Sequence, residues 1–310
     1  MSPVGGVGEP GRLVFASIVS PSKASETNAL LLAESIRDFA GSLSQAPIWF
    51  FTPGDREQLS MAIRNRLSNL DITLIPFNVD PEVLEFPFTG HAQAAALAEE
   101  RARGQADLLA WLAANTVVLQ EPEGFLLREG KTLGYRPVHH TLVGSCYDEP
   151  LDSFWTLIYR YCEVPEDRVF PMETHVDGTM IRPYFNAGIL VTRPEKGLLG
   201  AWRDIYFRVY REPSFQEFYL QDGRYRVFVH QAVLSGVILS TLEKDEIQEL
   251  PPVYNYPLHL YAEDVTDDRP SCLEELMTLR HEGFYKDPGW MGRMPAGEPL
   301  KRWLAERLPR

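Results

Sequence analysis

The chain has 310 residues, of which 45% are hydrophobic and 24% are charged, and its formal net charge is −13. This composition is typical of a soluble globular protein with one large or two modest domains. The acidic balance and the lack of any Lys/Arg run argue against a nucleic-acid partner, and no apolar run approaches the roughly 20 residues that span a bilayer.

Residues 1–12 lack an apolar core and predict a flexible lead-in rather than a signal peptide. Short apolar runs then alternate with stretches of helical apolar spacing. The predicted strands are 13–19, 47–51, 71–77 and 109–119, and the predicted helices are 25–40, 57–70 and 91–103. Ser25 or Thr27 can cap the first helix, and Gly41 ends it. This alternation predicts an α/β fold with a mostly parallel, doubly wound sheet.

The second half is less regular but shows no linker, so 13–310 is predicted to be a single domain. Strand character occurs at 131–144 and at 184–191, where the Asn-Ala-Gly step predicts a kink. A tight turn is predicted at 254–257. The predicted helices of this half are 151–162, 198–211, a helix from 230 onward, 272–279 and 300–308.

The stretch LAWLAANTVVL, at 109–119, is a buried strand interrupted by a turn at Ala113, Ala114 and Asn115. Ligands of open α/β sheets bind beyond the carboxyl ends of such strands. The turn is therefore the first place to expect chemistry, yet it carries no charge.

The cysteines and three of the histidines do not indicate a metal site. Three widely spaced cysteines, at 146, 162 and 272, predict neither a disulfide framework nor a zinc site and favour a reducing, cytoplasmic setting. His139, His140 and His175 match no ligand spacing, so we expect them to be surface side chains.

Four stretches, taken in order, resemble the GT-A-fold glycosyltransferases of family 8, the glycogenin and galactinol synthase type. The 109–119 run has the frame of the family's strand that ends in an Asp-x-Asp turn. YFNAGILV, at 184–191, resembles its Phe-Asn-x-Gly strand. Gln231 and the Tyr-Asn-Tyr turn at 254–256 resemble its next two features. HEGFYKDPGW, at 281–290, resembles its late His-x-x-Gly-x-x-Lys-Pro-Trp segment with altered spacing.

The resemblance implies a GT-A-like fold and a pocket for a nucleotide sugar, of which a UDP-sugar is the favoured candidate. It also implies that the sugar is transferred with retention of its anomeric configuration. In the family the two aspartates and the late histidine hold a divalent metal, usually Mn²⁺, which neutralises the donor diphosphate. Here Ala113 and Asn115 replace the aspartates, and His230 replaces the aspartate before Gln231. Neutral groups are poor ligands for Mn²⁺ or Mg²⁺, so no metal cofactor is expected, and His281 is the one candidate ligand.

The resemblance also implies the site residues. The catalytic residues implied are Asn186, His230 and Gln231, and the donor-binding residues implied are Ser17, Val19, Ala113, Asn115, His281, Gly283 and Lys286.

Several of these residues have a structural alternative. Asn115 can be an ordinary turn residue, and Asn186 can be a bulge in a strand. His230 can be a packed helix residue, and Lys286 can be a solvated charge. For Lys286 we favour a diphosphate contact, because without a metal some cation must offset the phosphates. The alternative cations are Arg136, Arg182 and Arg193.

The predicted function is therefore a glycosyltransferase that uses a nucleotide sugar with little or no dependence on metal. Its acceptor is not identified by the sequence. The alternative is a catalytically silent nucleotide-sugar-binding or scaffold protein on the same fold. Turnover of a nucleotide sugar distinguishes the two.

Overall fold

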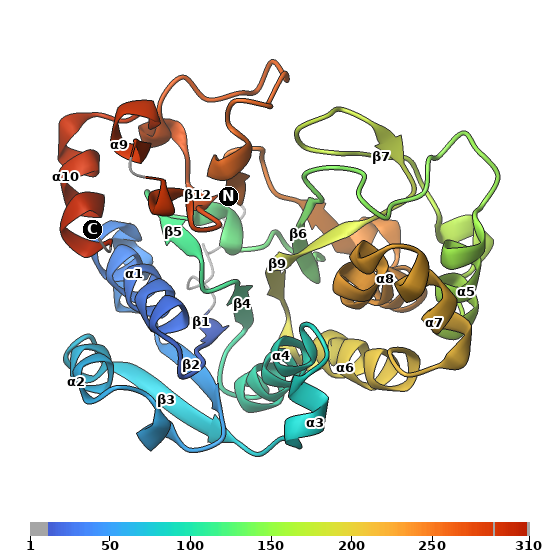
Figure 1. Cartoon of the computed structure of the whole chain (residues 1–310), viewed down its shortest axis with the longest axis horizontal. Helices are drawn as coiled ribbons and strands as arrows, with labels where there is room; N and C mark the ends of the chain where they lie inside the picture. Colours follow the sequence, from blue (N-terminus) through green and yellow to red (C-terminus); the bar gives the residue numbers. More distant parts are fainter. Residues whose placement is uncertain (1–11, 288, 309–310) are drawn as a thin grey trace, which may run out of the picture.

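The structure is a computed structural model that describes residues 12–287 and 289–308. A seven-stranded sheet forms its centre. Its strands are β1 (Leu13–Ile18), β2 (Ile48–Pro53), β3 (Ile72–Phe77), β4 (Leu108–Leu112), β6 (Leu133–Pro137), β9 (Phe185–Thr192) and β10 (Ile247–Glu249). Their order is β10-β6-β9-β4-β1-β2-β3, and β9 alone runs against the others (Figure 1). The predicted α/β fold with a mostly parallel sheet is confirmed. The lead-in predicted at 1–12 lies, apart from Arg12, outside the described residues.

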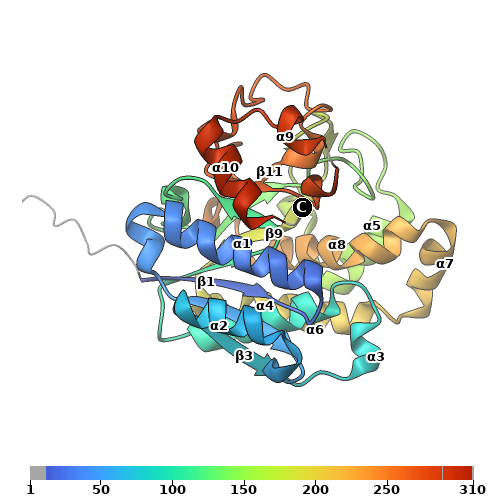
Figure 2. The same cartoon turned by 60° about the vertical axis from the view of Figure 1, so that its left-hand side comes forward.

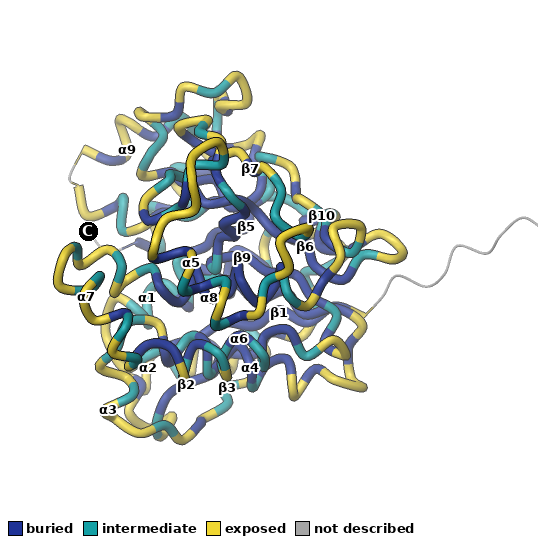
Figure 3. Tube along the Cα trace, turned by 90° about the vertical axis from the view of Figure 1, so that its right-hand side faces the viewer, coloured by how far each residue is buried: buried dark blue, intermediate teal, exposed yellow. Residues whose placement is uncertain are grey.

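Helices cover both faces of this sheet, so its central strands are buried on both sides (Figure 3). Successive strand residues face opposite ways. In β1, Leu13 and Phe15 therefore pack into one core cluster, whereas Val14 and Ala16 pack into another. The first cluster includes residues of α1 (Lys23–Phe39) and α2 (Met61–Asn69). The second includes residues of α4 (Thr89–Ala102), α5 (Ser153–Cys162), α6 (Leu198–Val209), α7 (Pro213–Gln221) and α8 (Gly223–Thr241).

The C-terminal segment builds a third cluster beside α1. Its small sheet joins β5 (Thr116–Val118), β11 (Tyr256–Pro257) and β12 (Thr278–Arg280), and its helices are α9 (Trp290–Arg293) and α10 (Glu298–Arg307). Trp303 of α10 packs on Phe39 of α1, with ring centroids 5.0 Å apart. Figures 1 and 2 both show α10 next to α1. The remaining short elements are α3 (Pro81–Leu84), β7 (Met172–Glu173) and β8 (Met180–Ile181).

Most predicted elements are present with shifted ends. The first helix begins after Ser22, whose hydroxyl accepts a hydrogen bond from the Ser25 amide at 3.2 Å. Ser22 is thus the N-cap, and the prediction of Ser25 or Thr27 is wrong. The helix predicted from 230 begins earlier, at Gly223.

The helix predicted at 272–279 is wrong. A single 3-10 turn, Leu273–Glu275, is followed by strand β12, which pairs antiparallel with β5. Apolar residues at helical spacing suggested a helix there, but pairing with a distant strand determines the backbone.

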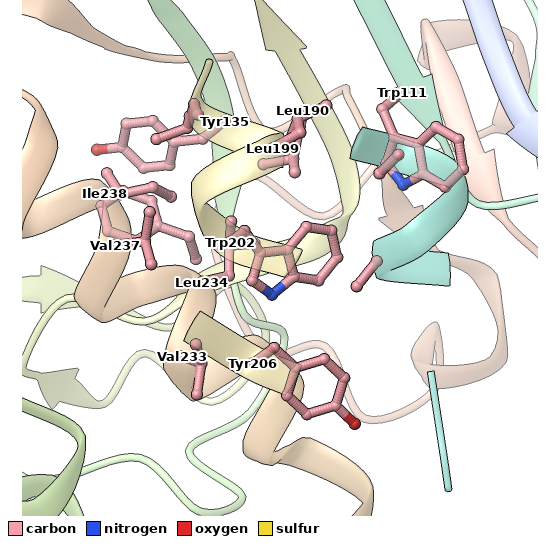
Figure 4. Packing of buried hydrophobic residues seen from close by; sticks show 14 of the residues in the cluster. Trp111, Tyr135, Leu190, Leu199, Trp202, Tyr206, Val233, Leu234, Val237 and Ile238 are labelled. Atoms are coloured by element: carbon pink, nitrogen blue, oxygen red, sulfur yellow. The ribbon is translucent and has the colours of Figure 1, made fainter. Parts of the chain in front are cut away.

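Aromatic residues of α6 fix the position of α8 against the sheet (Figure 4). Trp202 is 1% exposed, and its indole N–H donates to the backbone oxygen of His230 at 2.8 Å. The Tyr206 hydroxyl donates to the backbone oxygen of Pro87. These two hydrogen bonds fix α8 and the residues before α4 to α6. His230 and Phe88, which follows Pro87, both line the cavity of the candidate site.

Gly236 allows α8 to approach α5, because a Cβ there would lie 2.5 Å from the sulfur of Cys162. We expect Gly236→Ala to lower the free energy of unfolding by about 1–3 kcal/mol, since overpacking outweighs the higher helix propensity of alanine. Urea denaturation measures the change. The control is Gly223→Ala in the same helix, where a Cβ meets nothing within 4 Å. A Gly236→Ala protein as stable as this control would contradict the close approach.

Candidate functional site

A cavity of about 450 Å³ lies beyond the carboxyl ends of β1 and β4, and we call it the central cavity. Because β9 runs against its neighbours, its first residues lie at this same edge of the sheet. Several parts of the chain that are distant in sequence contribute to its lining. The lining residues used below are Ile18, Ser20, Phe88, His91, Ala113, Ala114, Asn115, Gly188, His230, Gln231, Arg280 and Glu282.

The turn at 113–115 forms one wall of the cavity and is held by backbone hydrogen bonds. The Ala113 amide donates to the oxygen of Gly188 at 2.8 Å, and the His281 amide donates to the oxygen of Asn115 at 3.1 Å. The turn is therefore fixed to β9 on one side and to the residues after β12 on the other. It presents two methyl groups and one neutral amide, and no carboxylate.

Asn186 lies near the start of β9, in the stretch where the register of β9 against β6 is irregular. Its side-chain oxygen accepts from the Gly188 amide at 2.9 Å, and its Nδ2 lies 3.4 Å from Nε2 of His139. Asn186 is buried and does not itself line the cavity, whereas Gly188 does. The structural reading of Asn186 as a bend in the strand thus describes its contacts, and its catalytic role stays a prediction.

Two neighbouring residues of α8 face the cavity. The side-chain oxygen of Gln231 accepts from the Ala187 amide at 2.9 Å, which fixes the amide plane. Nδ1 of His230 donates to the backbone oxygen of Val227 at 2.8 Å, so Nε2 is the unprotonated nitrogen of the neutral ring. Burial lowers the pKa of His230 to about 3, and its ring stacks on Phe88 at 4.0 Å.

Arg280 and Glu282 were not singled out from the sequence, yet they supply the charges of the cavity. Among the described lining residues they are the only arginine, lysine, aspartate or glutamate. Arg280 ends β12, opposite Thr116 of β5, and its guanidinium forms an ion pair with Glu282. The one feature of the sequence that could have identified Arg280 is its position, because it directly precedes His281 and the segment that resembles the family.

Ser17 and Val19 of the predicted donor site have side chains that do not line the cavity. The Ser17 hydroxyl donates to the backbone oxygen of Leu112 at 2.7 Å, and Val19 is fully buried in the α1 cluster. Ile18 and Ser20 line the cavity instead. The reason is the alternation of strand side chains, which a continuously buried strand does not reveal in its sequence.

His281, Gly283 and Lys286 also lie outside the lining of the cavity. The ring of His281 is 4% exposed in the C-terminal cluster, and its Nδ1 accepts from the Gly283 amide at 3.1 Å. Gly283 has a φ of 75°, and the stem of Lys286 lies over it. The Lys286 side chain is exposed, and Pro288 of the same segment is outside the described residues.

The three alternative cations are engaged elsewhere. Arg136 pairs with Glu249, Arg182 donates to backbone oxygens at 146 and 149, and Arg193 donates to the Lys131 oxygen. None of them is among the described residues that line the central cavity.

The residues at the turn do not fit a hard divalent metal. Ala113 offers no ligand atom, Asn115 offers only a neutral oxygen, and Nδ1 of His281 is occupied by the Gly283 amide. In residues 12–287 and 289–308 no group of three or more His, Cys, Asp or Glu side chains is arranged to hold a metal ion.

Two of the histidines expected at the surface, His139 and His175, are half-buried and buried, respectively. His175 is 8% exposed, and its Nδ1 accepts from the Arg136 guanidinium at 2.6 Å. The ring of His139 lies 6.1 Å from it, beside Asn186 and Asn255. The prediction of a surface position is therefore wrong for His175. It lies in the turn between β7 and β8, but its amide donates to the oxygen of Val138 and the Arg136 guanidinium contacts its ring.

The family model that matches the chain is the Rhodobacterales glycosyltransferase domain, over residues 16–241. None of the curated proteins compared with the chain matches it significantly. Among solved structures, the galactosyltransferase LgtC in complex with donor and acceptor sugar analogues is similar, with a TM-score of 0.50 and 14% identity over 95% of this chain and 100% of that one. The bifunctional glycosyltransferase WbbM has a TM-score of 0.48, with 12% identity over 98% of this chain and 53% of its own. Mouse xyloside xylosyltransferase 1 has a TM-score of 0.46, with 11% identity over 86% of this chain and 96% of its own. The similarity to LgtC shows the GT-A-like fold.

The neutral histidines make stability depend on pH. Burial lowers the pKa of His230 to about 3 and those of His175 and His281 to about 4, whereas each titrates near about 6.5 when unfolded. Below that value the unfolded chain binds more protons, so the free energy of unfolding should fall as pH falls from about 6.5 towards 4, by roughly 1–3 kcal/mol per histidine.

Urea unfolding at several pH values measures this dependence. His281→Gln should make the free energy of unfolding depend less steeply on pH, because it removes one of the buried neutral imidazoles. If the free energy of unfolding depends equally on pH in the native and His281→Gln proteins, His281 is not a neutral buried residue.

Proposed function

Because the chain belongs to the Rhodobacterales glycosyltransferase domain family, we propose that the central cavity binds a nucleotide-sugar donor, a UDP-sugar first, for transfer to an acceptor. The observation that carries the proposal is the convergence of the 113–115 turn, Gly188 and Gln231 on one cavity. These residues come from three of the stretches that resemble family 8. LgtC, which has a similar fold, was crystallised with donor and acceptor sugar analogues. This supports the proposal that the central cavity binds a sugar donor and its acceptor.

The geometry suggests how the sugar is oriented. Gln231 has its oxygen fixed by the Ala187 amide, so its NH₂ group is left to donate. Next to it, Nε2 of His230 is an acceptor, because Nδ1 carries the proton. A donor and an acceptor side by side match the hydroxyl groups of a sugar ring. We assign these two residues to sugar positioning, with Asn115 at the diphosphate end and retention of configuration as the resemblance implies.

A catalytically silent nucleotide-sugar-binding protein is the second candidate, and one observation favours it. Among the described lining residues the only carboxylate is Glu282, and it is engaged with Arg280. Release of UDP from UDP-glucose or UDP-galactose, with and without added acceptor sugars, separates the candidates. Binding without release above background supports the silent protein.

Filling the cavity tests whether it is the binding site. Ala114 lines the cavity, so Ala114→Trp should occupy part of it and weaken binding of UDP-sugars at least about tenfold, which is about 1.4 kcal/mol. The matched control is Met61→Trp on α2, where the native side chain is 69% exposed. Calorimetry measures both. Unchanged binding by a folded Ala114→Trp protein would place the donor elsewhere.

Metal dependence is a separate prediction. We expect a chelator to change UDP binding to the native protein by no more than about twofold, because the turn and His281 offer too few ligands. Ala113→Asp with Asn115→Asp should create Mn²⁺-dependent binding. Without metal this double mutant should bind worse than the native protein, since two carboxylates would repel the phosphates. Calorimetry with and without Mn²⁺ measures this.

Strong chelator sensitivity of the native protein would contradict metal-independent binding. If Mn²⁺ does not change the UDP affinity of the double mutant, the turn does not face the diphosphate.

No helix in the described part of the chain combines the length and apolar character needed to cross a bilayer. The cytoplasmic setting inferred from the cysteines stays a prediction.

A further inference from the structure

Arg280 is the cation around which the described histidines near the cavity are arranged. Its charge contributes to lowering the pKa of five histidines, in each case after burial, which is the larger cause: His91, His139, His230, His259 and His281. Histidines that remain neutral do not compete with Arg280 for an anion. The positive charge of the central cavity is therefore concentrated on one guanidinium.

The contacts of this guanidinium leave it incompletely paired. Its side chain is 19% exposed and lies over Gly188, where a Cβ would come within 2.6 Å of Nη1. Nη1 donates to the side-chain oxygen of Asn186 at 3.4 Å, and Nη2 pairs with Glu282. Within the described residues Nε is buried and has no hydrogen-bond partner, so the donors left for a ligand are the second N–H groups of Nη1 and Nη2. A guanidinium has five N–H donors, so a further acceptor can be bound.

The guanidinium is also close to the uncharged turn. Arg280 lies opposite Thr116 across the β5–β12 pair, and the next amide along the chain, that of His281, donates to Asn115. The cation is thus placed beside the turn that offers no anionic ligand for a metal.

We propose that the Arg280 guanidinium binds the donor diphosphate directly, in the role a divalent metal would serve, and that Glu282 is an exchangeable counter-ion that the phosphate displaces. This inference rests on the proposed function. A guanidinium fork matches phosphate oxygens bidentately and keeps its charge at any physiological pH. Lys286, favoured from the sequence, is exposed and outside the lining.

Glu282 has the properties of a displaceable partner. Its side chain is 37% exposed, so a displaced carboxylate can be solvated. Burial raises the pKa of Glu282, but Arg280 and a hydrogen bond from Asn115 together hold it below the ordinary value, so the group is an anion when the cavity is empty. The backbone of Glu282 has a φ of 43°, a left-handed conformation that few non-glycine residues adopt. Without ligand, the pair avoids an unpaired partly buried charge.

Two substitutions should change diphosphate binding in opposite directions. Arg280→Met should weaken UDP binding about 10- to 100-fold and leave uridine, which lacks phosphates, unchanged. Arg280→Lys should lie between, because lysine keeps the charge but loses the fork. Glu282→Gln should strengthen UDP binding several-fold, because the phosphate no longer has to displace a carboxylate from Arg280. Calorimetry at low salt with UDP and uridine measures all three, and the uridine affinity shows that each variant is folded.

The matched control is Arg293→Met, which removes an exposed arginine of the same segment that pairs with Asp287. Native UDP affinity in Arg280→Met, or a loss confined to Lys286→Met, would overturn the role of Arg280. Weaker UDP binding in Glu282→Gln would overturn the exchange. If the native protein binds neither UDP nor uridine, the proposed function fails. If it binds UDP with an affinity that does not change when Arg280 is substituted, only the role of Arg280 is refuted.

Discussion

The antiparallel pairing of β5 with β12 is the interaction on which the candidate site depends. It joins strands separated by about half the chain, with Leu279 opposite Val117 and Arg280 opposite Thr116. Because the 113–115 turn leads directly from β4 into β5, this pairing carries the C-terminal segment to the carboxyl edge of the central sheet. Backbone hydrogen bonds, rather than a side-chain contact, thus determine which charge reaches the cavity.

The fold was readable from the sequence because it follows local patterns. Continuous apolar runs identified the doubly covered strands, and helical spacing identified the helices between them. Where tertiary pairing overrides the local pattern, the sequence misled. Residues 272–279 have apolar side chains at helical spacing, yet Thr278–Arg280 is a strand because β5 offers its free edge.

The candidate site was only partly predictable, for two physical reasons. Of the predicted residues, those that line the cavity are Ala113, Asn115, His230 and Gln231, because the motifs that contain them lie at the same edge of the sheet. Ser17 and Val19 face away because a strand buried on both faces gives no sign of which side meets the ligand. Arg280 was overlooked because its importance arises from a register between distant strands, and no neighbouring residue signals that register.

The match to the glycosyltransferase family ends at residue 241, well before β12. Apart from β10 and the first residues of β1, the central sheet falls inside the matched region, as do the 113–115 turn, Gly188 and Gln231. Arg280 and Glu282 fall beyond it. Most of the scaffold of the cavity and its charged pair therefore come from different parts of the sequence. Two relatives can share the whole matched region and still differ in ionic chemistry, according to which C-terminal segment pairs with β5. Family membership alone is then a poor guide to electrostatics at the cavity, and the sequence after the matched region is where such relatives should be compared.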